Sequence, residues 1–85
     1  MINVYLAKGE YTNQYYLVYY SKNGPVQSAG DSCQLLESLH NIKKEHKNID
    51  IKNLSDKLKK EHSAIIKDNL VDVSKELIEN LELIL

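Results

Sequence analysis

The chain has 85 residues, enough for one hydrophobic core, and a domain of this size removes only about 60–65% of its unfolded surface from water. Hydrophobic residues make up 42% and charged residues 27%, a composition that excludes a disordered chain. The single cysteine, Cys33, excludes an internal disulfide, whereas small secreted domains normally need several. We therefore expect one folded domain over residues 1–85, cytoplasmic, with no targeting or membrane-spanning segment.

The formal net charge of −1 conceals an uneven distribution of charge along the chain. From Lys43 to Lys60 seven lysines stand against three acids, whereas from Glu61 onward six acids stand against two lysines. All eleven basic residues are lysine, and the chain has no tryptophan or phenylalanine. Such usage is typical of AT-rich coding sequence, so we expect a low-GC bacterium, its phage or a mobile element as the source.

Two strands are predicted near the start of the chain. Residues 2–7 alternate with period two, which places Ile2, Val4 and Leu6 on one face. Residues 15–20 are rich in aromatic and β-branched side chains, and the polar stretch between the two segments suits a connection. The pattern predicts a β-hairpin.

A third strand is predicted with a loop before it. Asn23-Gly24 is typical of a two-residue turn, but Pro25 follows and has no N–H to donate. We therefore expect a wider loop over residues 21–25. A short strand near residues 26–27 should then lie at an edge of the sheet.

The first helix is predicted from its cap. Asp31 and Gln34 have the spacing of a capping box, so the helix should begin there and end near residues 46–48. Its apolar stripe consists of Leu35, Leu36, Leu39 and Ile42. Residues 49–52 alternate too briefly to decide between a strand and an extended link.

A second helix can be capped by Asn53 or Ser55. Its apolar positions at helical spacing are Leu54, Leu58 and Ile65. Asp68-Asn69 then offers a turn and a new cap. The helix after it would carry Leu70, Val73, Leu77, Leu81 and Ile84. The competing interpretation makes residues 64–67 and 70–73 a hairpin and leaves a shorter terminal helix.

Together the elements predict an α+β fold, in which an N-terminal antiparallel β-hairpin or three-stranded sheet packs against two or three amphipathic helices. Residues for chemistry are few. The zinc-type side chains are Cys33, His40, His46 and His62, without the close pairs that seed a site. We expect no metal and no cofactor.

Catalysis is also weakly supported. Cys33 falls in the first turn of a predicted helix, where the helix dipole can make a thiol nucleophilic. No cysteine-hydrolase signature surrounds it, however, and free cysteines are usually buried, so its reactivity stays open. No pair of carboxylates or of nucleophile and base can be assembled, and we expect a protein that is not an enzyme.

The tyrosines are the most unusual feature, because all six fall within the first twenty residues. On a strand, tyrosines 15 and 19 face opposite to tyrosines 16 and 20. One set can pack on the helices, and the other needs cover from another element, a second copy or a partner, unless its hydroxyls simply reach water at the rim of the sheet. The expected partner-binding residues are Tyr11, Tyr15, Tyr16, Tyr19, Tyr20, Lys43, Lys44, Lys47, Lys57, Lys59 and Lys60. The apolar C-terminal helix is either well enclosed or half of an interface, and the expected homodimer interface consists of Leu81, Leu83, Ile84 and Leu85.

These observations favour a small non-catalytic protein-binding module, such as a regulator, inhibitor or adaptor. Its tyrosines would anchor an unidentified protein partner, and its lysines would steer an acidic one. The alternative is a nucleic-acid-associated protein that uses the cluster from Lys43 to Lys60. The absence of arginine, the main side chain of guanine recognition, makes this alternative weaker.

Overall fold

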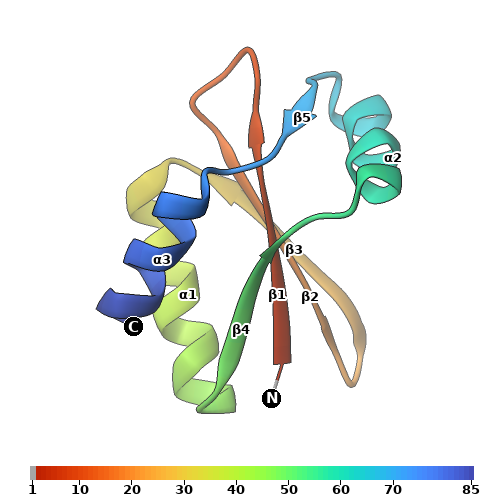
Figure 1. Cartoon of the computed structure of the whole chain (residues 1–85). Coiled ribbons are helices and arrows are strands. Elements are labelled where there is room, and N and C mark those ends of the chain that lie inside the picture. The colour runs from red at the N-terminus through yellow and green to blue at the C-terminus, as the bar shows by residue number, and fades with distance from the viewer. Residues whose placement is uncertain (1) are drawn as a thin grey trace.

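The computed structural model describes residues 2–85. Over those residues the strands are β1 (Ile2–Gly9), β2 (Tyr15–Ser21), β3 (Gly24–Gly30), β4 (Ile49–Asn53) and β5 (Leu70–Val71). The helices are α1 (Ser32–His46), α2 (Asp56–Ile66) and α3 (Lys75–Ile84). The predicted α+β class is confirmed, with a mixed sheet packed against helices (Figure 1).

The strands lie in the order β3-β2-β1-β4, with β5 paired to the end of β1. β1 pairs antiparallel with β2, so that Val4 lies opposite Tyr19. On its other side β1 pairs parallel with β4, where Val4 lies opposite Ile51, and antiparallel with β5. β1 is therefore the central strand.

Helices cover the two faces of the sheet unequally. α1 and α3 lie side by side on one face, which we call the covered face, and α2 lies on the other, beside β5 at one end (Figure 1). The core of the covered face consists of Val4, Leu6, Leu17, Leu35, Leu39, Ile42, Ile51, Val73 and Leu81. On the other face a smaller cluster under α2 consists of Ala7, Leu54 and Leu70. We call this second face the half-open face.

The hairpin between β2 and β3 differs from the prediction of a wide loop. The turn has only two residues between Ser21 and Gly24, which lie opposite each other, and Gly24 has a φ of +109°. Pro25 lies within β3, opposite Tyr20. The prediction was wrong because β3 is an edge strand, where a proline can turn its missing N–H away from the ladder. The third strand is also longer than the predicted one.

The capping box of α1 is confirmed. Gln34 N donates to Asp31 Oδ1 at 2.9 Å, and Asp31 N donates to Gln34 Oε1 at 3.3 Å. The helix ends at His46, where Lys47 adopts a φ of +61° and closes the last turn. Leu35, Leu39 and Ile42 are buried as the stripe predicts, and Leu36 is half-buried.

The segment 49–53 is a strand because β1 offers it a parallel partner along its whole length. Ser55, rather than Asn53, caps α2 by accepting from Leu58 N. Ile65, one of the three apolar positions at helical spacing, does not pack on the sheet, since its side chain is 76% exposed. Leu54 lies before the cap and so does not set the phase of the helix. Leu58 and Ile66 pack against the smaller cluster instead.

Both interpretations of residues 64–73 were wrong in part. α2 continues to Ile66, which excludes a strand there, and Leu70–Val71 forms β5 rather than the start of a helix. Ser74 caps α3, so this helix begins only at Lys75. The apolar residues before it are buried in an extended segment, which imitates helical spacing.

We predict that Leu39→Ala lowers the free energy of unfolding by about 3 kcal/mol, because Leu39 is fully buried between α1 and the sheet. The matched control is Ile65→Ala, which removes an exposed side chain from α2 and should change it by less than about 0.5 kcal/mol. Urea unfolding followed by circular dichroism measures both. Equal losses in the two variants would contradict this packing.

Candidate functional site

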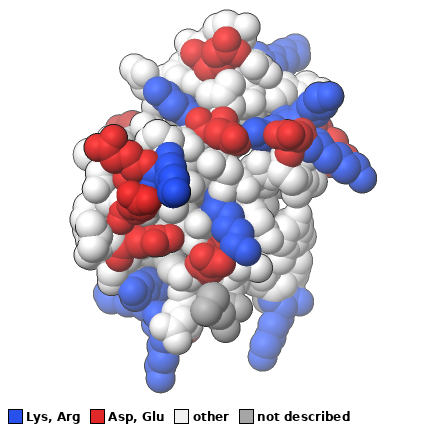
Figure 2. Space-filling model, viewed as in Figure 1, with Lys and Arg blue, Asp and Glu red and all other residues white. Residues whose placement is uncertain are grey.

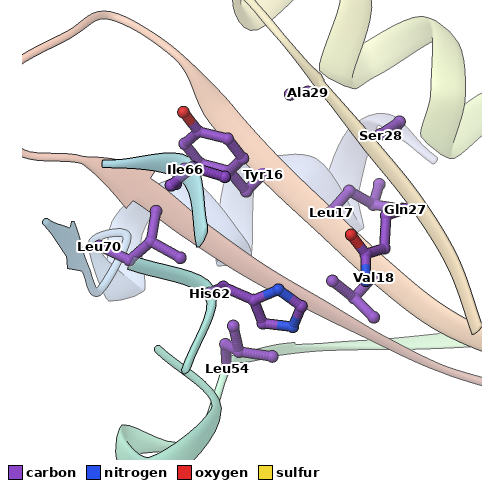
Figure 3. A pocket seen from close by; sticks show the side chains of 10 residues that line it. All are labelled: Tyr16, Leu17, Val18, Gln27, Ser28, Ala29, Leu54, His62, Ile66 and Leu70. Atoms are coloured by element: carbon purple, nitrogen blue, oxygen red, sulfur yellow. The ribbon is translucent and has the colours of Figure 1, made fainter. Parts of the chain in front are cut away.

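A pocket of about 200 Å³ opens on the half-open face between α2 and the strands β2 and β3. It is lined by Tyr16, Leu17, Val18, Gln27, Ser28, Ala29, Leu54, His62, Ile66 and Leu70. Figure 3 shows the imidazole of His62 reaching from α2 toward Val18 and Gln27 of the sheet. The lining is mostly apolar, with a few polar groups at its margin.

The pocket exists because α2 packs over only one end of the half-open face. Leu58 and Ile66 bring the helix onto the cluster around Ala7 and Leu70. β3 contributes small or polar side chains on this face, Gln27 and Ala29, and both are exposed. The space between helix and edge strand is therefore left open.

Hydrogen bonds fix α2 to the segment that contains β5. Ser63 Oγ donates to Lys59 O at 2.6 Å and accepts from Leu70 N at 2.9 Å. Lys59 Nζ also contacts Asp72, and it lies 3.0 Å from Asp56 Oδ1. Hydrogen bonds to Asp72, and then to Asp56, raise the pKa of Lys59 above its ordinary value of 10.5. These bonds fasten the flank of α2 that faces the β5 segment.

The buried carboxylate Asp68 has a structural role beside the pocket. It accepts from Thr12 Oγ1 at 2.8 Å and from Tyr11 N at 3.3 Å, which fastens the loop between β1 and β2. A Cβ added at Gly9 would lie 2.3 Å from Asp68 Oδ2, so this close approach requires glycine. The two hydrogen bonds give this carboxylate a role in holding the loop.

The structure separates the tyrosines that were predicted to bind a partner. Tyr15 and Tyr19 pack against the core of the covered face, and Tyr16 packs against the smaller cluster. Tyr11 and Tyr20 are 77% and 51% exposed but lie near opposite ends of β2. The five side chains do not form one surface.

The predicted lysine cluster is also divided. Lys43, Lys44 and Lys47 lie at the C-terminal end of α1, on the covered face. Lys57, Lys59 and Lys60 lie on α2, on the half-open face, beyond the five residues of β4. A strand of that length spans about 16 Å. Figure 2 shows acidic side chains among the lysines of this view rather than a continuous basic surface.

The predicted dimer residues at the C-terminus are likewise split. Leu81 is buried and Leu85 packs against the covered-face core, whereas Leu83 is 84% exposed and Ile84 is also exposed. Ile84 lines an apolar groove between α1 and α3 that also contains Cys33. Among the residues described, no histidine or acid lines that groove, and Cys33 itself is exposed.

Of the predicted partner-binding residues only Tyr16 lines the pocket, and most of its other lining residues were missed at the level of sequence. Gln27, Ala29, His62 and Ile66 come from segments far apart in the chain, and none has an unusual local pattern. A weak signal was the pair Ile65-Ile66, because adjacent residues on a helix point about 100° apart and one of two apolar neighbours can stay exposed.

Comparisons with protein-family models, with curated proteins and with solved structures find no match to this chain. Among residues 2–85 no helix is both long and apolar enough to cross a bilayer. Within the same residues no three side chains of the metal-binding types come together. The site is therefore interpreted from its own geometry.

We predict that Lys59→Met lowers the free energy of unfolding at neutral pH by about 1 kcal/mol or less, because the carboxylate partners are solvent-exposed. Since folding raises the pKa of Lys59, the contribution of this residue to the free energy of unfolding is complete below pH 10.5. The contribution is lost as the pH rises through the pKa of Lys59 in the folded state. The difference between wild type and variant should therefore shrink at alkaline pH. Urea titrations across this range measure it, and a growing difference would contradict the assignment.

Proposed function

We propose that this domain is a non-catalytic protein-binding module, a regulator, inhibitor or adaptor, whose contact site is the pocket of the half-open face. The observation that carries the proposal is an apolar pocket that the chain leaves open beside exposed edge residues. Exposed apolar concavities rimmed by polar groups are typical of interaction sites.

The size of the pocket supports a protein ligand over a cofactor. Sites for drug-sized molecules and cofactors usually have volumes of about 300–1,000 Å³, whereas this pocket has about 200 Å³. An apolar side chain of a partner is a better match to that volume. His62 and Gln27 at the margin can give hydrogen bonds that orient the bound segment.

An exposed isoleucine extends the apolar surface of the site. Ser63 and Lys59 face the β5 segment, and helical geometry places Ile65 on another side of α2, where its side chain is 76% exposed. An exposed isoleucine costs solvation free energy, and contact with a partner would remove that cost. Ile65 is therefore a proposed additional anchor, adjacent in sequence to the pocket-lining Ile66.

The nucleic-acid alternative receives less support, because phosphate binding needs lysines gathered on one surface and these lysines lie on two. The single cysteine supports a cytoplasmic location, because it excludes an internal disulfide. The use of lysine without arginine is typical of AT-rich coding sequence, which supports a low-GC bacterium, phage or mobile element as the source.

We predict that wild-type protein selects peptides with an apolar or aromatic anchor from a random-peptide phage library. Ala29→Trp should abolish that binding by filling the mouth of the pocket. The matched control is Val26→Trp, on the same strand but facing the covered side, which should retain it. NMR titration of a selected peptide should shift the amide signals of Gln27, Ala29 and His62.

Two outcomes would contradict the proposal. Peptides that bind Ala29→Trp as tightly as wild type would exclude the pocket as the contact site. Tight binding of random oligonucleotides, lost in Lys57→Glu or Lys60→Glu, would favour the nucleic-acid alternative instead.

A further inference from the structure

The two outer strands of the sheet differ in how they are protected. β4 carries Asp50 and Lys52, and its end is tied to Val73 through the side chain of Asn53, which donates to Val73 O and accepts from Val73 N. β3 carries no charged residue, its residues 25–29 are exposed, and within residues 2–85 no segment pairs with its outer side. An uncharged and uncovered edge is a template for another strand.

The register shows which backbone groups of β3 face outward. Gly9 N donates to Gln14 O at 2.9 Å, so this pair of residues exchanges hydrogen bonds between β1 and the start of β2. Because bonded and non-bonded pairs alternate, Leu17 and Tyr19 direct their backbone groups toward β3, onto Ser28 and Val26. The groups of residues 25, 27 and 29 therefore point away from the sheet.

We propose that a second copy of this chain pairs antiparallel with β3 across a two-fold axis at Gln27. This register aligns the whole strand, because Gly24 lies opposite Gly30 of the second copy. Gln27 N–H donates to the Gln27 carbonyl of the other copy, and Ala29 N–H donates to its Pro25 carbonyl. Pro25 has no N–H, so every outward donor of β3 is used and none is left unpaired.

The charges at the two ends of β3 favour this arrangement over a parallel one. Lys22 lies in the turn before the strand and Asp31 directly follows it, and both are exposed. Antiparallel pairing brings Lys22 of each copy beside Asp31 of the other, at both ends of the seam. A parallel arrangement would place like charges together, which is unfavourable.

The axis stands perpendicular to the sheet, so the dimer joins two sheets into one with both pockets on the same side. Gln27 lines each pocket and also lies at the seam. The pairing does not depend on the proposed function, because it rests on the backbone of the edge strand and on the two charges.

The experiment is sedimentation velocity of the full chain from dilute to millimolar concentration. A single strand pair buries less than the roughly 1,200 Å² of standard interfaces, so the dimer should be weak and reversible. The weight-average mass should rise from 9.8 kDa toward twice that value. A mass that stays at the monomer value at millimolar concentration would overturn the proposal.

Two variants at the centre of the seam separate backbone from side chain. Gln27→Pro removes an outward N–H that β2 does not use, so it should keep the circular dichroism spectrum and abolish the dimer. The matched control, Gln27→Thr, keeps the N–H and should still dimerise. A dimer that survives Gln27→Pro would overturn the proposal. Loss of the dimer in Leu83→Glu would overturn it too, because the interface would then involve α3.

Charge reversal in the turn gives a test that does not alter the strand. Lys22→Glu faces Asp31 of the other copy and should weaken dimerisation at least several-fold at low salt, with a smaller effect at high salt. Asp31→Asn preserves the oxygen that caps α1. This variant should weaken dimerisation less than Lys22→Glu, since it removes an attraction without adding a repulsion. An unchanged dimerisation constant in Lys22→Glu would exclude this register.

Discussion

The structure depends on the position of β1 between two partners. Alternate residues of β1 direct their backbone groups to opposite sides, toward β2 on one side and β4 on the other. Parallel pairing with β4 requires a connection that returns the chain to its starting end, and α1, with 15 residues, is that connection. Because α1 crosses the sheet from the β3 edge to the β4 edge, its apolar stripe must pack on one face, and the larger core forms there.

The second face receives what remains of the chain. Two helices cover one side, whereas α2, with 11 residues, has a length of about 16 Å and covers one end of the other. Ser63, Lys59 and the β5 segment then hold α2 close to the end of β1. The pocket is thus a consequence of chain length and of where α2 is fastened, and its open side lies over β3.

Local patterns predicted the elements whose causes are local. Alternation over residues 2–7 and the Asp31–Gln34 capping box identified β1 and the start of α1, because both signals act within a few residues. The failures have causes distant in the chain. β5 exists because β1 accepts it, and Pro25 is tolerated because within residues 2–85 no strand pairs with the outer side of β3. The pocket joins residues 27–29 to residues 62–66. No single segment carries a signal for such contacts, which is why the sequence pointed to tyrosines and lysines that the fold then separated.

The small side chains of β3 connect the two proposals. Bulky side chains at positions 27 and 29 would fill the space beside α2, whereas Gln27 and Ala29 leave the pocket open, and residues 25–29 leave the edge exposed. Gln27 belongs to both features, so pairing at the edge would orient a lining residue of each pocket. A partner with two apolar anchors could then bind both pockets at once, and linked binding raises the effective affinity without any new contact. Weak dimerisation would in that case be strengthened by the partner, since each added contact favours the paired state.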